Sequence, residues 1–131
     1  MEFFTQTAST WDEQGLKAAL SMADLPKWCE AIEAHLESDE AASWGRYDTI
    51  WGVFEITRMP IRGGYRYLLP HCPNALTWSV TTGLPPDLDA VVVHATINRE
   101  NHEPDFIESL EEFVDAWRVG IGRMAEASAA D

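Results

Sequence analysis

One cysteine, in the segment His71-Cys72-Pro73-Asn74, is the residue whose setting most invites a chemical interpretation. It lies within residues 56–86, which contain three arginines and no acidic residue. Positive surroundings lower the pKa of a thiol, and the thiolate is the reactive form. A catalytic cysteine also needs a base within hydrogen-bond reach, and the histidines follow no recognisable spacing around this one. We therefore favour a structural loop cysteine and keep Cys72 as a candidate reactive thiol.

Metal and cofactor sites have equally little support in the sequence. His71, Cys72, His94 and His102 could converge at one end of a sheet, but the chain lacks the Cys-x-x-Cys and His-Glu-x-x-His spacings of zinc sites. It also lacks an EF-hand loop, a glycine fingerprint, a phosphate loop and a Gly-x-Ser-x-Gly elbow. We expect no metal, no cofactor and no catalytic residue.

Aromatic and arginine residues gather in the middle of the chain and suggest a binding surface. Trp, Tyr and Arg dominate the energetically important positions of protein interfaces. The candidates are Trp51, Arg58, Arg62, Tyr65 and Arg66. An alternative stays open, in which most of these rings belong to the core and the arginines are rim charges stacked on them.

The charge of the chain is segregated along its length. Nine basic and 22 acidic residues give a net charge of −13. Residues 1–55 and 87–131 each carry 11 acids and three bases, on either side of the acid-free segment. This balance disfavours direct nucleic-acid or anionic-membrane binding, because phosphate contacts need Lys or Arg. We expect a protein partner, with these acidic residues as binding candidates on a C-terminal helix: Glu108, Glu111, Glu112 and Asp115.

The length of 131 residues predicts a single domain over 1–131, with an Ala/Ser-rich tail at 125–131 that should fray. Its 46% hydrophobic content can build a core without metals or disulfides. No apolar run is long enough for a membrane span, and the first residues do not resemble a signal peptide, which predicts a cytoplasmic protein. Cys29 and Cys72 are expected to be reduced thiols, although a bridge between them stays open.

Apolar residues recurring with helical spacing predict three helices. The first follows the capping sequence at residues 10–13, and the second starts at Asp24 and runs to about residues 38–43, with Trp28, Ile32 and Leu36 on one stripe. The third is the strongest, with an apolar face formed by Phe106, Leu110, Phe113, Val114, Trp117, Ile121 and Met124.

Alternating or β-branched stretches predict four strands between the second and third helices, at Tyr47–Arg58, Tyr65–Leu69, Ala75–Thr82 and Ala90–Ile97. The resulting order, α-α-β-β-β-β-α, favours an α+β two-layer sandwich. A four-stranded antiparallel meander would be covered on one face by the long C-terminal helix and the N-terminal helix pair. Whether the other face is exposed stays open.

These observations favour a small acidic protein-interaction module without catalytic activity, such as an inhibitor, an immunity-type protein or an adaptor, with a homodimer as one form of assembly. One alternative is a DNA-mimic inhibitor whose helix carboxylates imitate phosphates. Another is a small-molecule-binding protein or a thiol-dependent enzyme that uses Cys72 in a pocket between helix and sheet. A deep, closed pocket containing Cys72 or His94 would favour the last alternative, and regularly spaced outward carboxylates would favour the DNA mimic. An exposed apolar and aromatic sheet face would favour the interaction module or a homodimer.

Overall fold

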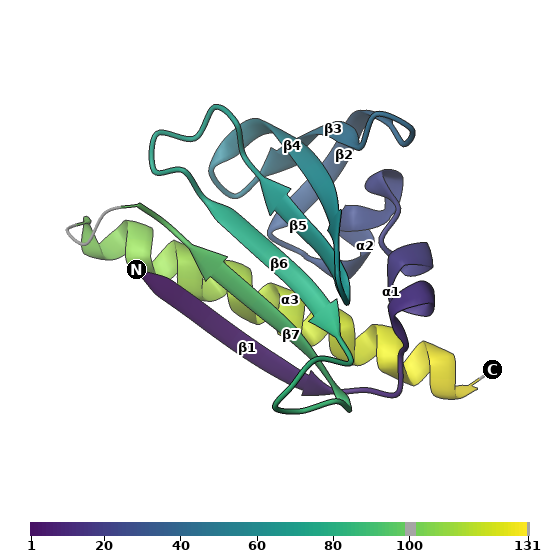
Figure 1. Cartoon of the computed structure of the whole chain (residues 1–131). Helices are drawn as coiled ribbons and strands as arrows, with labels where there is room; N and C mark the ends of the chain where they lie inside the picture. Colours follow the sequence, from purple (N-terminus) through teal and green to yellow (C-terminus); the bar gives the residue numbers. More distant parts are fainter. Residues whose placement is uncertain (99–101, 131) are drawn as a thin grey trace.

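The computed structural model describes residues 1–98 and 102–130, without the side chains of 127–130. Over these residues the chain forms an α+β fold, in which a seven-stranded antiparallel sheet is crossed on one face by a long helix (Figure 1). This confirms the predicted class, the antiparallel sheet and the C-terminal helix packed on it. The elements, in chain order, are β1 (Glu2–Ala8), α1 (Glu13–Ala19), the 3-10 helix η1 (Met22–Asp24), α2 (Leu25–Trp28), β2 (Ile32–Asp39), β3 (Trp44–Thr49), β4 (Gly52–Ile61), β5 (Gly64–Leu68), β6 (Thr77–Thr82), β7 (Ala90–Thr96) and α3 (Pro104–Ala130).

The strands follow one another through the sheet as a meander, with β1 added at one end. The order is β1-β7-β6-β5-β4-β3-β2, and every neighbouring pair is antiparallel. Alternation sets the two faces, because successive side chains of a strand point to opposite sides. In β6 the side chains of Trp78 and Val80 are buried on one face, whereas Thr77 and Ser79 are half-exposed on the other.

Two strands lie where the sequence predicts none. Glu2 pairs with Thr96 at one end of the β1–β7 ladder, so β1 depends on a partner at the other end of the chain. The predicted second helix is also wrong beyond Trp28, because the backbone is extended at Cys29 (φ −144°, ψ 108°) and the following residues form β2. Apolar residues spaced four apart lie on one stripe of a helix, but they also lie on one face of a strand, where every second side chain points the same way. The spacing therefore could not distinguish a helix from a strand.

The predicted strand Tyr47–Arg58 is a hairpin instead. Thr49 pairs with Gly52, and Ile50 and Trp51 form the turn between β3 and β4. Gly52 has a φ of +111°, which residues with a side chain rarely adopt, and it lets the chain reverse here. The next turn is shorter than predicted, since Pro60 and Ile61 belong to β4. The split of one predicted strand into β3 and β4, together with the two extra strands β1 and β2, turns the predicted four strands into seven.

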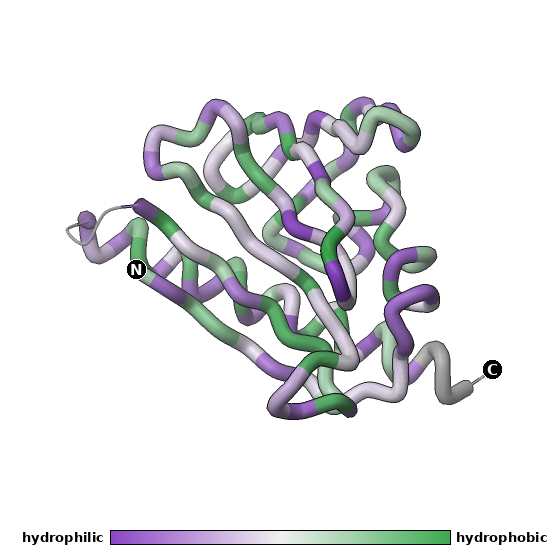
Figure 2. The backbone as a smooth tube through the Cα atoms, in the orientation of Figure 1, coloured by the Kyte–Doolittle hydropathy of each residue, from purple (hydrophilic) through white to green (hydrophobic). Residues whose placement is uncertain are grey.

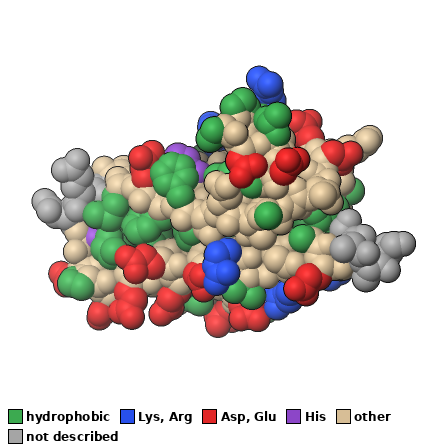
Figure 3. Space-filling view, turned by 90° about the horizontal axis from the view of Figure 1, so that it is seen from below, with side chains coloured by type: hydrophobic (Ala, Val, Ile, Leu, Met, Phe, Trp, Pro, Cys, Tyr) green, Lys and Arg blue, Asp and Glu red, His purple; other side chains and the backbone are tan. Residues whose placement is uncertain are grey.

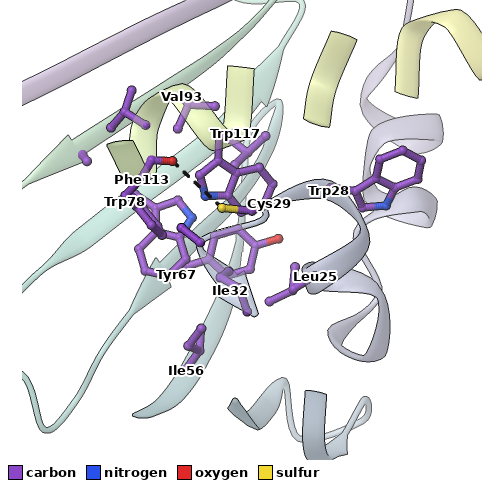
Figure 4. Packing of buried hydrophobic residues seen from close by; sticks show 14 of the residues in the cluster. Leu25, Trp28, Cys29, Ile32, Ile56, Tyr67, Trp78, Val93, Phe113 and Trp117 are labelled. Atoms are coloured by element: carbon purple, nitrogen blue, oxygen red, sulfur yellow. Dashed lines mark hydrogen bonds between the residues drawn. The ribbon is translucent and has the colours of Figure 1, made fainter. Parts of the chain in front are cut away.

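The core lies between the sheet and α3, where large rings interlock (Figure 4). The rings of Tyr67 and Trp78 stack at 5.1 Å, and Phe113 meets Trp78 edge-on at 4.9 Å. Trp117, Phe113 and Trp78 are each at most 1% exposed. Figure 2 shows apolar and polar positions interleaved along α3, as expected for a helix with one buried face. Among the described residues, no helix combines the length and the apolar character needed to cross a membrane.

Candidate functional site

A small pocket opens at the end of the core where α3 begins. Its volume is about 180 Å³, and its exposed lining is mostly apolar. The walls come from the β3–β4 turn, β4, the β5–β6 connection and the first turn of α3. They are formed by Trp51, Phe54, Leu69, Cys72, Pro73, Asn74, Leu76 and Phe106. Side chains that are far apart in the sequence therefore meet around one cavity between helix and sheet.

Trp51 forms a fixed wall of this pocket. The indole Nε1 donates a hydrogen bond of 2.8 Å to Ser109 Oγ, which in turn donates to the Phe106 carbonyl at 2.6 Å. The Trp51 ring packs against Phe113, with centroids 5.2 Å apart, and against Phe106 at 6.5 Å. The sequence selects Trp51 as a surface binding residue, whereas the structure joins it to the start of α3.

The β5–β6 connection forms the opposite wall and is held by backbone hydrogen bonds. The amide of Cys72 donates to Leu69 O at 3.0 Å, and the amide of Ala75 donates to Cys72 O at 3.1 Å. Ala75 has a φ of +51°, a left-handed conformation that costs a residue with a Cβ roughly 1 kcal/mol or more. This strained backbone conformation occurs at a position that directs the short Cys72–Asn74 segment toward the cavity.

Cys72 faces the pocket as a half-buried free thiol, but the neighbouring histidine is used elsewhere. His71 Nε2 lies 2.6 Å from Glu55 Oε2, and the His71 side chain is 71% exposed. His94 lies on the other face of the sheet, stacked on Phe4 with ring centroids 4.2 Å apart. In residues 1–98 and 102–130, no group of three His, Cys, Asp or Glu side chains is arranged to hold a metal ion. The pocket therefore presents a thiol without an assembled catalytic pair from His71 or His94.

The second cysteine lies in the filled part of the core. Cys29 is fully buried, and its thiol lies 3.9 Å from the carbonyl oxygen of Phe113 (Figure 4). Burial raises the pKa of Cys29 from 9.0 to about 12, because the thiolate would lose its hydration. The same effect raises the pKa of Tyr67 well above its usual value. These groups stay neutral at physiological pH and belong to the packing.

Arg58, a predicted binding residue, lies inside the fold. Its guanidinium donates to Leu20 O at 2.9 Å, pairs with Glu40 at 2.8 Å and lies 4.3 Å from the centre of the Tyr65 ring. These contacts tie the N-terminal helices to the sheet, so Arg58 and Tyr65 act there as structural residues. Arg62 is exposed in the β4–β5 turn, and Arg66 is exposed on the outer face of the sheet. The five candidates of the predicted aromatic and arginine surface thus lie in four different settings.

The acidic candidates are exposed along α3. Glu108, Glu111, Glu112 and Asp115 all lie on the solvent side of the helix, and Asp115 pairs with Arg118 at 2.8 Å. Figure 3, which views the molecule from below, shows many acidic side chains along this margin, with basic side chains among them. The sequence does not single out the pocket walls Phe54, Leu76 and Phe106, which follow ordinary apolar patterns. No local signal distinguishes them, because the cavity forms where four separate segments of the chain meet.

Neither a known protein family nor a curated protein sequence matches the chain. Solved structures do resemble its fold. A START superfamily protein from Mycobacterium smegmatis superposes with a TM-score of 0.64 at 14% identity, covering 96% of this chain and 97% of that one. An uncharacterised protein from Bacillus thuringiensis gives a TM-score of 0.59 at 10% identity, covering 90% and 96%. The protein XoxI from Bacillus cereus gives 0.58 at 11% identity, covering 89% and 92%. The chain therefore has a START-like fold.

Proposed function

We propose that the protein binds a small, largely apolar molecule in the pocket at the start of α3. The observation that carries the proposal is the cavity itself, with a volume of about 180 Å³ and walls of aromatic and aliphatic side chains. A dry apolar cavity of roughly 150 Å³ is enough to hold benzene, whereas drug-sized ligands occupy roughly 300 Å³ or more. The ligand class that fits is a single-ring or short branched apolar molecule.

The lining supports recognition by stacking and burial. The rings of Trp51, Phe54 and Phe106 provide flat apolar surfaces, and transfer of apolar area from water drives binding. The Cys72 thiol and the Asn74 amide are the polar side chains among the lining residues and would orient one polar substituent of the ligand. The Trp51–Ser109 hydrogen bond keeps one wall in place before the ligand arrives, which reduces the entropy cost of binding.

Binding is a better account of this pocket than thiol-dependent catalysis. A nucleophilic cysteine needs a base, and the adjacent His71 is paired with Glu55. The protein-interaction function favoured by the sequence remains a proposal, and it concerns a different part of the surface. The DNA-mimic alternative stays a prediction. No feature of the described residues distinguishes phosphate-mimicking carboxylates from ordinary solvent-facing ones.

A pocket-filling variant tests the proposal. We expect Cys72→Phe to occupy the cavity, whereas Cys72→Ala leaves it open and serves as the matched control. Toluene, phenol and indole should raise the melting temperature of the wild type and of Cys72→Ala, because a ligand that binds the folded state stabilises it. They should leave Cys72→Phe unchanged. Equal stabilisation of the filled variant, or no stabilisation of the wild type by any of the three probes at millimolar concentration, would contradict the proposal.

A further inference from the structure

The two edge strands of the sheet differ in how well they are protected against pairing with another chain. At one edge, β2 carries two register shifts, between Ile32 and Ala34 and between His35 and Glu37. Bulges of this kind distort an edge and discourage the addition of a strand. At the other edge, β1 keeps an uninterrupted register with β7 from Glu2 to Ala8 and contains neither Lys nor Pro. Within the described residues, no strand pairs with its outer side.

The ladder fixes which backbone groups of β1 point outward. Met1 and Ile97 exchange both backbone hydrogen bonds, at 3.1 and 3.2 Å, and Ser9 donates to Asp89 at 2.9 Å. Hydrogen-bonded pairs alternate along an antiparallel ladder, so every second residue from Met1 to Ser9 faces β7 with its backbone. The intervening residues direct their N–H and C=O groups to the free edge. They are Glu2, Phe4, Gln6 and Ala8.

A groove with acidic walls runs beside this edge. It has a volume of about 200 Å³ and is lined by residues 3–5 of β1 together with Glu111, Val114 and Asp115 of α3. On the other side of the edge, the Phe4 ring is 64% exposed and stacks on His94. Figure 3 shows the acidic margin of α3 next to apolar side chains on this side of the molecule. The α3 side of the edge therefore carries Glu111 and the Asp115–Arg118 ion pair, and the outer face exposes Phe4 between Glu2 and Gln6.

We propose that the free edge of β1 binds an extended segment of a partner protein in which basic and apolar side chains alternate. The added strand would bond to the outward backbone groups at Phe4 and Gln6 and their neighbours. Because its side chains alternate between two faces, one set would meet Glu111 and, in competition with Arg118, Asp115, and the other would pack beside Phe4. Basic residues fit the first set and apolar residues the second.

Charge argues for such a partner over a second copy of this chain. Each copy carries a net charge of −13, and β1 contains Glu2 and no basic residue. Pairing two β1 strands about a two-fold axis would bring the two acidic α3 margins toward each other, which repulsion opposes. A basic partner segment would instead be attracted to the acidic α3 margin. The groove and the ligand pocket share no lining residue, so strand addition at β1 is independent of ligand binding in the pocket.

The probe is a fluorescent eight-residue peptide, Lys-Val-Lys-Thr-Lys-Val-Lys-Thr, titrated with the full chain and followed by anisotropy. Its control has the same composition with the four lysines in one block, so that charge is equal and alternation is lost. We expect the alternating peptide to bind at least about tenfold more tightly, since only its side chains sort onto two faces of an added strand. Equal affinities would overturn the proposal, because they would show charge attraction without strand addition.

A pair of substitutions isolates the backbone contribution. Gln6→Pro removes an outward N–H without touching the ladder to β7, and Gln6→Ala removes the same side chain, including its bond to Asp87, but keeps the N–H. We expect Gln6→Pro to bind the alternating peptide about tenfold more weakly than Gln6→Ala does. Equal binding by the two folded variants would contradict strand addition.

A measurement on the wild type covers the case in which Gln6→Pro does not fold. In amide hydrogen exchange, the alternating peptide should protect the outward amides of Phe4 and Gln6 and leave those of the pocket loop unchanged. Unchanged exchange at Phe4 and Gln6 under saturating peptide would overturn the proposal. So would a concentration-dependent dimer of the wild type that protects the same two amides, since a second copy would then occupy the edge.

Discussion

The space between α3 and the sheet is lined by similar residues along its length but is packed differently toward its two ends. The filled end begins around the middle of α3, and the open end lies at the start of α3. Around the middle of α3, the rings of Tyr67, Trp78 and Trp117 fill the space and are at most 1% exposed. At its start, Trp51 and Phe106 are half-exposed and leave a cavity of about 180 Å³. The difference follows from what faces the helix, because strands face its middle and a short loop faces its start. The same layer thus serves as a core at one end and as a candidate binding site at the other.

Large-to-small substitutions on the same helix should give the largest difference between these ends. Trp117→Ala should lower the free energy of unfolding by about 3 to 5 kcal/mol, because a fully buried ring is lost and a cavity remains. Phe106→Ala should cost only about 1 kcal/mol, since Phe106 is half-exposed at the rim of an existing cavity. Urea denaturation of both variants measures the two costs. Similar values would mean that the two ends do not differ in packing.

Alkaline pH should destabilise the filled end through Cys29. The unfolded chain releases this proton near pH 9.0, whereas the folded protein keeps it up to about pH 12. The folded state therefore binds more protons over this range, and its stability should fall as pH rises, by up to about 1.4 kcal/mol per pH unit for one group. Burial raises the pKa of Tyr67 in the same direction, which adds to the loss at higher pH.

Unfolding measured from pH 8 to 11 tests this prediction, with Cys29→Ala as the comparison. The variant starts less stable because it loses a packed sulfur, but its stability should depend less steeply on pH. Parallel curves for the two proteins would show that Cys29 does not hold its proton in the folded state.

The smallest effect is expected at the loop that shapes the pocket. Ala75→Gly should raise the free energy of unfolding by up to about 1 kcal/mol, because glycine adopts the φ of +51° without strain, although it loses more entropy on folding. Thermal unfolding would detect the change. A clear decrease in stability would show that the Ala75 methyl group contributes more to the wall than its backbone strain costs.

The sequence predicts those parts of the fold whose pattern is long or local. The apolar face of α3 and the alternation from Leu76 to Val80 suffice to place these elements, since each follows one period without ambiguity. The pattern fails at β1, whose mixed residues acquire their structure by pairing with β7 near the other end of the chain. It also fails at β2, where the four-residue spacing of Ile32 and Leu36 is compatible with a helix or a strand, and where two register shifts leave Ile32 buried and Leu36 exposed.

The candidate site is less accessible to such reasoning. Trp51 and Cys72 stand out by residue type, but Phe54 and Phe106 are ordinary members of apolar faces. Whether such residues fill a space or leave one depends on where loops and helix ends meet in three dimensions, which no spacing in the sequence records. Arg58 shows the reverse case, because a residue typical of interfaces is used here to fasten the N-terminal helices to the sheet.

The most direct test of the central claim is a crystal structure of the protein soaked with bromobenzene, with the bromine located by its anomalous scattering. We expect a bromine peak inside the cavity between Trp51, Cys72 and Phe106, with the ring against the aromatic walls. The same soak of Cys72→Phe should show no peak there. A wild-type crystal with the cavity unoccupied at saturating bromobenzene, or with bromine only at other sites, would contradict the claim that this end of the fold binds small apolar molecules.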